Sequence, residues 1–211
     1  MFAKHKTLIV LLVVLLLSAA LLIGRALDSS PPASEQAALR EAGIVLLPKS
    51  RALPALTLTG TDGQPVALDR LRGQWTLMFF GYTFCPDICP TTLAELSQLR
   101  RLLPEALQGR YQVLMVSVDP HRDTPEQLGR YLGFYKAGYR GLTGELADIQ
   151  TLAQAVSIPF VPGDTRRERY TVDHSGNLAL IGPDGRQRGF LRAPLNVPAL
   201  AAQLPALLGS D

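Results

Sequence analysis

The fold class is indicated by two apolar segments with a leucine-periodic segment between them. The apolar segments are Trp75 to Tyr82 (WTLMFFGY) and Gln112 to Val118 (QVLMVSV), and such runs are typical of strands covered on both faces. Between them, leucines recur every three to four residues from Leu93 to Leu103, which predicts an amphipathic helix. The order strand, helix, strand indicates a parallel crossover unit and therefore an α/β domain.

The segments on either side of this unit predict a larger sheet. Upstream, residues 55–59 and 66–68 flank the turn Gly60-Thr61-Asp62-Gly63, which indicates a β-hairpin. Downstream, Thr124-Pro125-Glu126-Gln127 has the form of a capping box and predicts a helix to about Ala137. Further elements are expected as a helix over 145–155, strands over 170–173, 178–181 and 187–190, a turn at Pro183-Asp184-Gly185 and a closing helix over 197–208. This order is that of a thioredoxin-like fold, a central mixed β-sheet flanked by helices.

An uncharged N-terminal segment predicts one transmembrane helix. Residues 7–24 (TLIVLLVVLLLSAALLIG) contain no charge and are close to the roughly 20 residues that span a bilayer as helix. A cleaved signal peptide is the alternative, but this run exceeds the usual length of its apolar region. Arg25 also interrupts the small residues Gly24 and Ala26 where cleavage would be expected, so we favour a retained anchor.

The charges around the segment predict its orientation. Lys4, His5 and Lys6 precede it and only Arg25 follows, so the N-terminus is expected in the cytoplasm and the rest of the chain in the bacterial periplasm, on a single-pass inner-membrane protein. We expect three parts: a membrane anchor with its basic flank over 1–27, a periplasmic tether over 28–51 and a folded domain over 52–211. The periplasm is oxidising, so close cysteines would form a disulfide there unless they are reduced or bound to metal.

The basic character of the chain is confined to its N-terminus. The net charge is +3, but Lys4, Lys6 and Arg25 all precede the first acidic residue, Asp28. From Asp28 onward 18 basic residues face all 18 acidic ones, so the exported part is neutral. A nucleic-acid-binding domain concentrates positive charge, and no nucleic-acid partner is therefore expected.

The two cysteines of the chain lie in one short motif, Cys85-Pro86-Asp87-Ile88-Cys89, between the first predicted central strand and its helix. Ligands and reactive groups gather at the carboxyl ends of parallel strands, and a helix N-terminus lowers the pKa of a thiol. A structural disulfide, a redox-active pair and a metal site are all compatible with this motif. A bridge across so short a loop would remove little entropy from the unfolded chain, so a purely stabilising role is weak.

His174, in Val172-Asp173-His174-Ser175, is the histidine that would distinguish a metal site from a redox pair. His5 belongs to the flank of the membrane segment, and His121 is expected in a solvated loop. A lone histidine often has no ligand role. If His174 lies against the cysteine loop, two thiolates and one imidazole suit three-coordinate Cu(I), whereas structural Zn²⁺ would need a fourth ligand.

Several charged residues near these motifs have ordinary interpretations as well as functional ones. Asp87 could oppose thiolate formation and favour a bound cation, or it could begin the helix. For Asp119 and Asp123 we favour a turn. Shortly before His174 lies a basic stretch that consists of Arg166, Arg167 and Arg169. This stretch could dock an acidic partner, but we prefer the interpretation that it is a solvated loop.

Three segments together resemble the SCO/SenC family. They are Gly81-Tyr82-Thr83-Phe84-Cys85-Pro86-Asp87-Ile88-Cys89-Pro90, then Ser117-Val118-Asp119-Pro120 with Arg122-Asp123-Thr124-Pro125, then Val172-Asp173-His174-Ser175, within a similarity that runs over 53–208. The resemblance implies a membrane-anchored copper protein with a thioredoxin-like domain, needed to assemble the binuclear copper site of cytochrome c oxidase. It also implies that Cys85, Cys89 and His174 bind one copper ion per chain, as Cu(I) or Cu(II).

The leading hypothesis is therefore a periplasmic copper metallochaperone, which is not an enzyme in the turnover sense. Its expected partners are the copper-site subunit of the oxidase, periplasmic copper donors, thiol reductants and the inner membrane. The alternative is a thiol-disulfide reductase in which Cys85 and Cys89 are the redox-active pair and keep the cysteines of the oxidase copper site reduced. A third hypothesis is a copper or redox sensor.

Overall fold

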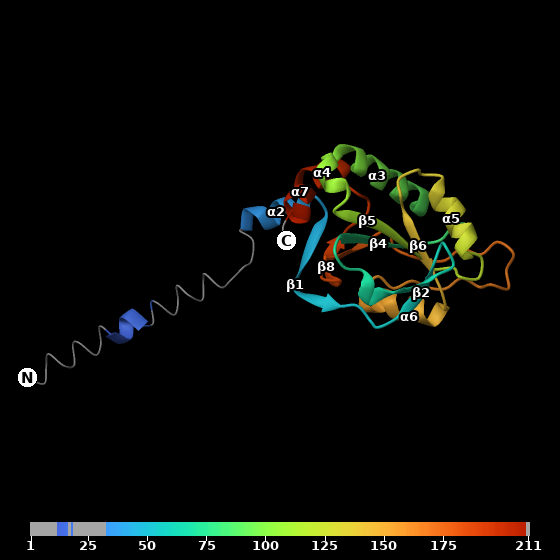
Figure 1. The fold of residues 1–211 in the computed structure, drawn as a ribbon, viewed down its shortest axis with the longest axis horizontal. Coiled ribbons are helices and arrows are strands. Elements are labelled where there is room, and N and C mark those ends of the chain that lie inside the picture. Colours follow the sequence, from blue (N-terminus) through green and yellow to red (C-terminus); the bar gives the residue numbers. More distant parts are fainter. Residues whose placement is uncertain (1–11, 17, 19–32, 210–211) are drawn as a thin grey trace, which may run out of the picture. The chain divides into compact units, whose positions relative to one another are not determined.

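The computed structural model describes residues 12–16, 18 and 33–209. The chain divides into two compact units, residues 1–37 and 38–211, and the second carries the sheet and its helices (Figure 1).

In the first unit, the described residues Leu12 to Leu16 are helical. Within the described ranges, no helix combines the length and the hydrophobicity needed to cross a membrane. Most of residues 7–24, where sequence analysis predicts the anchor, lies outside the described residues, so the anchor stays a prediction.

Eight strands of the second unit form one mixed sheet in the order β1-β8-β7-β4-β5-β6-β2-β3. β4 pairs in parallel with β5, and β5 pairs in parallel with β6, which confirms the predicted parallel unit. The other pairings are antiparallel. The strands are β1 (Ile44–Ala52), β2 (Thr57–Gly60), β3 (Pro65–Ala67), β4 (Trp75–Gly81), β5 (Tyr111–Ser117), β6 (Arg140–Thr143), β7 (Leu178–Ile181) and β8 (Arg186–Leu191).

Helices cover both faces of this sheet. In Figure 1, α3 and α7 lie together on one face and α6 lies on the other, so the predicted sheet flanked by helices is confirmed. The helices are α2 (Ala33–Glu41), the 3-10 turn η1 (Leu68–Arg70), α3 (Ile88–Leu102), α4 (Glu105–Gln108), α5 (Pro125–Gly133), α6 (Leu146–Ala155) and α7 (Val197–Gly209).

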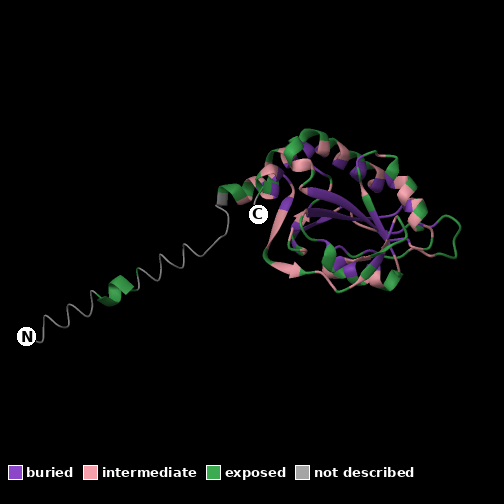
Figure 2. Cartoon of the chain, viewed as in Figure 1, coloured by how far each residue is buried: buried purple, intermediate pink, exposed green. Residues whose placement is uncertain are grey.

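The part of the core that positions the site lies between the central strands and α3. Every residue of β4 and β5 is buried, as their apolar sequences predict (Figure 2). The periodic leucines of α3 are buried against them: Leu93, Leu96 and Leu99. Burying each leucine contributes about 1.5–3 kcal/mol, so α3 is held firmly over the carboxyl end of β4, where the cysteine motif lies.

The predicted helix after β5 forms with the cap that its sequence indicates. Thr124 Oγ1 accepts a hydrogen bond from the Gln127 backbone N–H at 3.2 Å, and proline occupies the first turn. The helix ends at Gly133 and not at Ala137. From Phe134 to Lys136 each backbone N–H bonds the carbonyl three residues back, and Lys136 has a left-handed φ of 49°, so the helix cannot reach Ala137.

Residues 44–51, which sequence analysis places in the tether, belong to the edge strand β1 instead. β1 pairs with β8, and its register shifts between Leu46 and Arg51. Pro48 lies in this stretch, and proline within a strand is tolerated at a sheet edge, where no neighbour needs its missing N–H group. The absence of a period-two hydrophobic pattern around Pro48 hid the strand from sequence analysis.

Two further segments differ from expectation. Residues 170–173 do not form a strand; Asp173 makes one isolated bridge to Val161, and the segment is held by side chains of other loops. Conversely, the short strand β6 was not expected, since it contains Gly141. A Cβ atom at Gly141 would lie 2.7 Å from Leu128 of α5, so glycine lets the helix pack closely on the strand.

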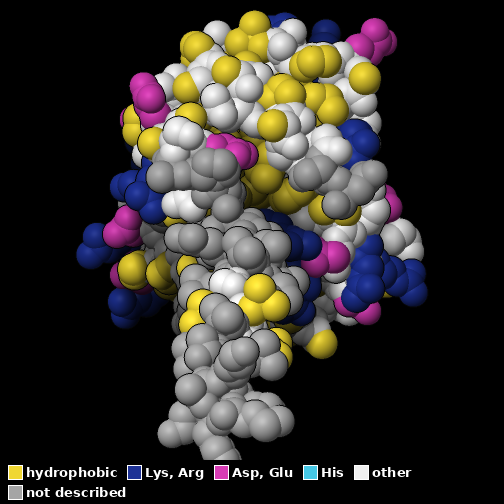
Figure 3. All heavy atoms as spheres, turned by 90° about the vertical axis from the view of Figure 1, so that its left-hand side faces the viewer, with side chains coloured by type: hydrophobic (Ala, Val, Ile, Leu, Met, Phe, Trp, Pro, Cys, Tyr) yellow, Lys and Arg dark blue, Asp and Glu magenta, His cyan; other side chains and the backbone are white. Residues whose placement is uncertain are grey.

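Some apolar side chains reach the surface of the second unit. Leu102 at the end of α3 is 53% exposed and Phe134 after α5 is 82% exposed. On the face drawn in Figure 3, hydrophobic side chains gather in the upper part, whereas Lys and Arg side chains lie mainly in the lower part. Single exposed apolar residues are common on folded proteins and need no functional explanation.

Candidate metal centre

The cysteine motif joins the end of β4 to the first turn of α3. Cys85 lies in the connecting loop, where its backbone N–H donates to the Tyr82 carbonyl at 3.2 Å, and Cys89 is the second residue of α3. Cys85 is half-buried and Cys89 is buried. No disulfide joins these two cysteines in the structure.

Gly81, the last residue of β4, makes room for the buried sulfur. A Cβ atom at this position would lie 2.7 Å from Cys89 Sγ and 2.7 Å from the Phe79 ring. Real Cβ atoms do not approach other atoms so closely, so only glycine lets Cys89 pack directly against the strand.

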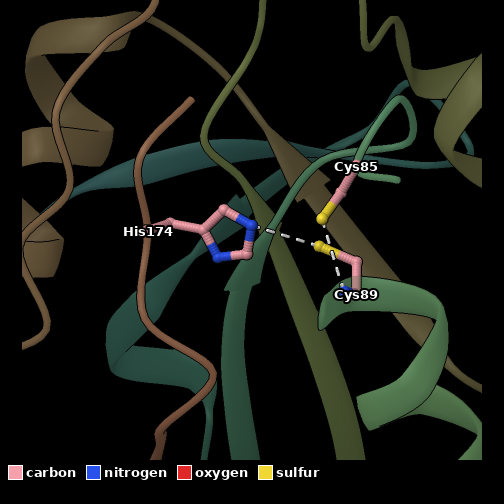
Figure 4. Close-up of side chains that lie close together, drawn as sticks. All are labelled: Cys85, Cys89 and His174. Atoms are coloured by element: carbon pink, nitrogen blue, oxygen red, sulfur yellow. Dashed lines mark hydrogen bonds between the residues drawn. The ribbon is translucent and has the colours of Figure 1, made fainter. Parts of the chain in front are cut away.

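His174 comes from a distant segment and meets the two cysteines. Its Nε2 lies 3.4 Å from Cys89 Sγ, and the Cys89 backbone N–H donates to Cys85 Sγ at 3.4 Å. The two sulfurs and one imidazole nitrogen all lie within 4.8 Å of one another. Figure 4 shows the three side chains pointing toward a common point. The structure therefore brings together the three residues that sequence analysis selected; their role as ligands stays a prediction.

The orientation of His174 is fixed by its neighbours. Its Nδ1 lies 3.3 Å from the Ser175 carbonyl oxygen, which can only accept, so a proton on Nδ1 would leave the Nε2 lone pair free for a metal ion. The ring also packs edge to face on Tyr82, with 5.4 Å between centroids. Tyr82 Oη in turn accepts a hydrogen bond from the Val172 backbone N–H at 3.3 Å. Tyr82 thus ties the cysteine loop to the histidine segment.

The two thiols differ strongly in acidity. The hydrogen bond with Cys89 is the largest cause that lowers the pKa of Cys85, and a hydrogen bond with His174 acts in the same direction; the pKa of Cys85 falls to about 3 against the opposing effect of burial. Burial is the largest cause that raises the pKa of Cys89, followed by its hydrogen bond to Cys85. At neutral pH the pair is therefore one thiolate and one thiol that share a proton.

The donor set fits a soft monovalent metal ion. Two cysteine sulfurs and one imidazole suit Cu(I), whereas structural Zn²⁺ is normally bound by four ligands. Within the described residues, the cluster with metal-binding geometry contains Cys85, Cys89 and His174 and no carboxylate. Asp87, between the cysteines, is exposed, and its side chain makes no capping hydrogen bond although it occupies the N-cap position of α3.

The two aspartates of the turn after β5 make tertiary contacts that sequence analysis does not predict. Asp119 does begin a turn, because its carbonyl accepts from the backbone N–H groups of Arg122 and Asp123. Both aspartates are also buried and fully engaged with side chains of other segments. No local signal could have revealed these contacts, since the partners Thr83 and Tyr170 are distant in the sequence.

The remaining candidates lie in exposed loops. His121 is exposed, as expected. The basic stretch before His174 is exposed too, with Arg166 and Arg167 paired to Asp164 at 2.8 and 3.5 Å. The preferred interpretation of a solvated loop therefore fits the structure.

Comparison with known proteins gives consistent matches. Residues 47–209 match the family model described as SCO1/SenC. A Stutzerimonas stutzeri protein, whose name describes it as a candidate copper-binding protein, is 46% identical over 175 residues, which are 83% of this chain and 86% of that protein. The mitochondrial SCO1 homologue of Mus musculus is 35% identical over 131 residues, which are 61% of this chain and 46% of the mouse protein. The chain thus spans about half the length of this mitochondrial relative.

A solved structure supports the same grouping. Bradyrhizobium japonicum ScoI, determined with copper bound, is 32% identical, with a TM-score of 0.63, and the similarity covers 73% of this chain and 98% of that one. The family model covers the cysteine motif, the turn after β5 and His174 in a single match. The chain therefore belongs to the SCO1/SenC family.

Proposed function

We propose that this protein is a membrane-anchored periplasmic metallochaperone that holds one copper ion and delivers it to the binuclear copper site of cytochrome c oxidase. The observation that carries the proposal is the convergence of Cys85 Sγ, Cys89 Sγ and His174 Nε2 within 4.8 Å. Membership of the SCO1/SenC family and the copper-bound ScoI relative support copper as the cargo. The function that the family resemblance implies supports the oxidase as recipient.

The arrangement is suited to release as well as binding. Three donors leave copper open to attack by a ligand of the recipient, so the ion can pass by exchange of one ligand at a time. Cys85 is half-buried and lies in a loop, so an incoming thiolate can reach the metal from its side. Cys89 must lose its proton when copper binds, and loading therefore releases a proton to solvent.

Copper titration of the reduced, detergent-solubilised full chain under anaerobic conditions tests the proposal. We expect one tightly bound Cu(I) per chain, and we expect His174→Ala to weaken it by about tenfold or more, because one of three ligands is lost. His121→Ala, at an exposed histidine, is the matched control and should bind like the wild type. Equal affinity of His174→Ala and wild type would contradict the proposed site. Transfer to the apo copper-site fragment of an oxidase subunit then tests delivery.

The location is part of the proposal and needs a separate test. Residues 7–24 and the positive residues before them support an inner-membrane anchor with the folded unit in the periplasm. A reporter enzyme that is active only in the periplasm, fused after Asp211, should be active. Alkaline carbonate should leave the full chain in the membrane fraction. Release of the chain by carbonate would contradict the anchor.

A thiol-disulfide reductase is a second candidate, supported by the asymmetry of the two thiols. Cys85 is more exposed and is the thiolate, as an attacking cysteine must be, while buried Cys89 is placed to resolve the mixed disulfide. In this reaction the two thiols supply two electrons, the target disulfide is reduced, and a Cys85–Cys89 disulfide forms. Such a disulfide cannot bind copper through two thiolates, so the two activities exclude each other at any moment. Cys89→Ser should trap the mixed disulfide, and His174→Ala should leave exchange intact.

A further inference from the structure

We propose that Arg122 is a positioning residue that holds the histidine segment against the cysteine loop and thereby controls how firmly His174 contributes to copper binding. This inference rests on the proposed function and assigns a role to the turn after β5. Arg122 contacts an aromatic ring in each of the two ligand-bearing segments, Phe84 in one and Tyr170 in the other.

The guanidinium of Arg122 is packed among aromatic rings of both segments. Its Cζ atom lies 3.6 Å from the ring centroid of Tyr170, four residues before His174. The same atom lies 4.8 Å from the ring of Phe84, the residue before Cys85, and 5.7 Å from that of Tyr82. Arginine stacks well on aromatic faces because its planar charge is weakly hydrated. One side chain therefore links the two segments.

A shared carboxylate strengthens the link. Asp119 accepts a hydrogen bond from Arg122 Nε at 2.5 Å and from the Tyr170 hydroxyl at 2.6 Å. Asp119 is only 3% exposed, so both bonds are shielded from water. Arg122 and Tyr170 are thus held to each other twice, by ring stacking and through the carboxylate.

The turn that carries Arg122 is itself fixed to the end of β5. The Asp119 backbone N–H donates to Ser117 Oγ at 3.1 Å, and Ser117 Oγ donates to Asp123 at 2.6 Å. Asp123 also accepts from the backbone N–H and the hydroxyl of Thr83, at 3.0 and 2.6 Å. Since Thr83 begins the cysteine loop, these hydrogen bonds tie the turn that carries Arg122 directly to that loop.

The link acts on the distance between His174 and the sulfurs, not on the distance between the sulfurs. Cys85 and Cys89 lie in one turn, joined by the Cys89 N–H bond to Cys85 Sγ, and α3 holds that turn in place. His174 belongs to a segment without regular strand structure. The segment is anchored near the site by the Val161 bridge, by contacts with Tyr82, Asp119 and Arg122, and by the Phe79 ring, which lies edge to face on His174. After His174, Asn177 Oδ1 accepts a hydrogen bond from the Ala193 N–H.

A double-mutant cycle on the full chain tests this role. Arg122→Lys keeps the charge but removes the planar guanidinium that stacks on Tyr170 and donates through Nε to Asp119. We expect it to weaken Cu(I) binding by about tenfold, the size of a lost cation–π contact and charge-assisted bond. In the His174→Ala background the same substitution should have no effect, because the ligand that it positions is gone. Tyr170→Phe keeps the ring and loses only the hydroxyl, so its effect should be smaller. Arg167→Lys, at a side chain 78% exposed in the same segment, is the control and should change nothing.

A readout without copper separates this inference from the proposed function. In the reduced apo chain, NMR cross-relaxation between the Tyr82 and His174 rings should be strong in the wild type, weakened in Arg122→Lys and retained in Arg167→Lys. Unchanged ring contacts in Arg122→Lys would overturn the positioning role. An equal loss of copper affinity in both backgrounds of the cycle would also overturn it, because it would indicate general destabilisation. A wild-type chain that binds no copper would overturn the proposed function instead.

Discussion

Cys89 Sγ lies 3.4 Å from His174 Nε2, although 85 residues separate the two in the chain. The contact joins the first turn of α3 to a segment that precedes β7, and β4 and β7 are neighbours in the sheet. Because the two strands are antiparallel, their pairing places the carboxyl end of β4 beside the amino end of β7, and the two residues of the contact come from segments adjoining these ends. The site depends on the register of the sheet as much as on the cysteine motif.

The asymmetry of the two thiols predicts selective alkylation of the reduced apo chain. Cys85 is half-exposed with a pKa of about 3, so it is a thiolate at every pH above that value and its alkylation rate should be nearly constant from about pH 5 to 8. Cys89 should react far more slowly, because it is buried and protonated. Mass spectrometry after timed iodoacetamide treatment measures both rates.

Removing the thiol of Cys89 should make the alkylation rate of Cys85 depend on pH. Its hydrogen bond with Cys89 is the largest cause of the low pKa, so Cys89→Ala should raise that pKa. The alkylation rate of the variant should then fall by about tenfold per pH unit below the new pKa. A rate as flat as that of the wild type would show that another group stabilises the thiolate.

Gly81→Ala should displace the buried sulfur. The new Cβ atom would lie 2.7 Å from Cys89 Sγ, and overpacking of a core site costs about 1–3 kcal/mol of unfolding free energy. We also expect weaker copper binding, because Cys89 must move. Gly133→Ala is the matched control: nothing lies within 4 Å of its added Cβ atom, so its copper affinity should equal that of the wild type. Urea unfolding and copper titration of both variants check the prediction.

Much of the fold could be predicted because its signals are local. The apolar runs of β4 and β5 and the leucine period of α3 reflect burial directly, and all three elements form as expected. β1 was not predicted because Pro48 interrupts its hydrophobic pattern, and β6 was not predicted because it is four residues long and contains glycine. Both strands depend on partners elsewhere in the sheet, which a single sequence does not reveal.

The grouping of the three candidate ligands was predictable to a similar extent, whereas their role as ligands stays a prediction. Cys85 and Cys89 are found from one motif, since both lie in one turn, and His174 is found because few histidines exist and because of the family resemblance. The Arg122 link could not be predicted in the same way. In sequence, Asp119 to Arg122 resembles a solvated turn, and only the tertiary fold brings the Tyr170 and Phe84 rings against it.

The N-cap of α5 provides a prediction that separates stability from the site. Thr124→Ala removes the oxygen that accepts from the Gln127 N–H, so it should lower the free energy of unfolding by about 1 kcal/mol. Thr124→Ser keeps that oxygen and should recover most of the loss. Copper affinity should be the same in both variants, since neither touches the ligands. Chemical denaturation with parallel copper titration checks both statements.

The raised pKa of the buried Asp123 carboxyl predicts that the free energy of unfolding depends on pH. Burial is the largest cause that raises its pKa above 3.8, and the nearby charge of Asp119 adds to it, while hydrogen bonds from Ser117 and Thr83 oppose it. Because the folded state holds this proton more tightly than the unfolded state, the contribution of Asp123 to stability is greatest below the unfolded pKa. It declines as the pH rises through the raised folded pKa.

Asp123→Asn tests that pH dependence. The variant cannot ionise, so the decline should be absent from the difference between its unfolding free energy and that of the wild type. It should nevertheless be less stable than the wild type at pH 7 by about 1–3 kcal/mol, because one amide oxygen cannot replace a carboxylate that accepts from Thr83 and Ser117 together. Asp69→Asn, at an exposed carboxylate, is the control and should match the wild type. A wild-type stability that rises with pH through this range relative to Asp123→Asn would show that the hydrogen bonds outweigh burial and that the folded pKa of Asp123 is lowered.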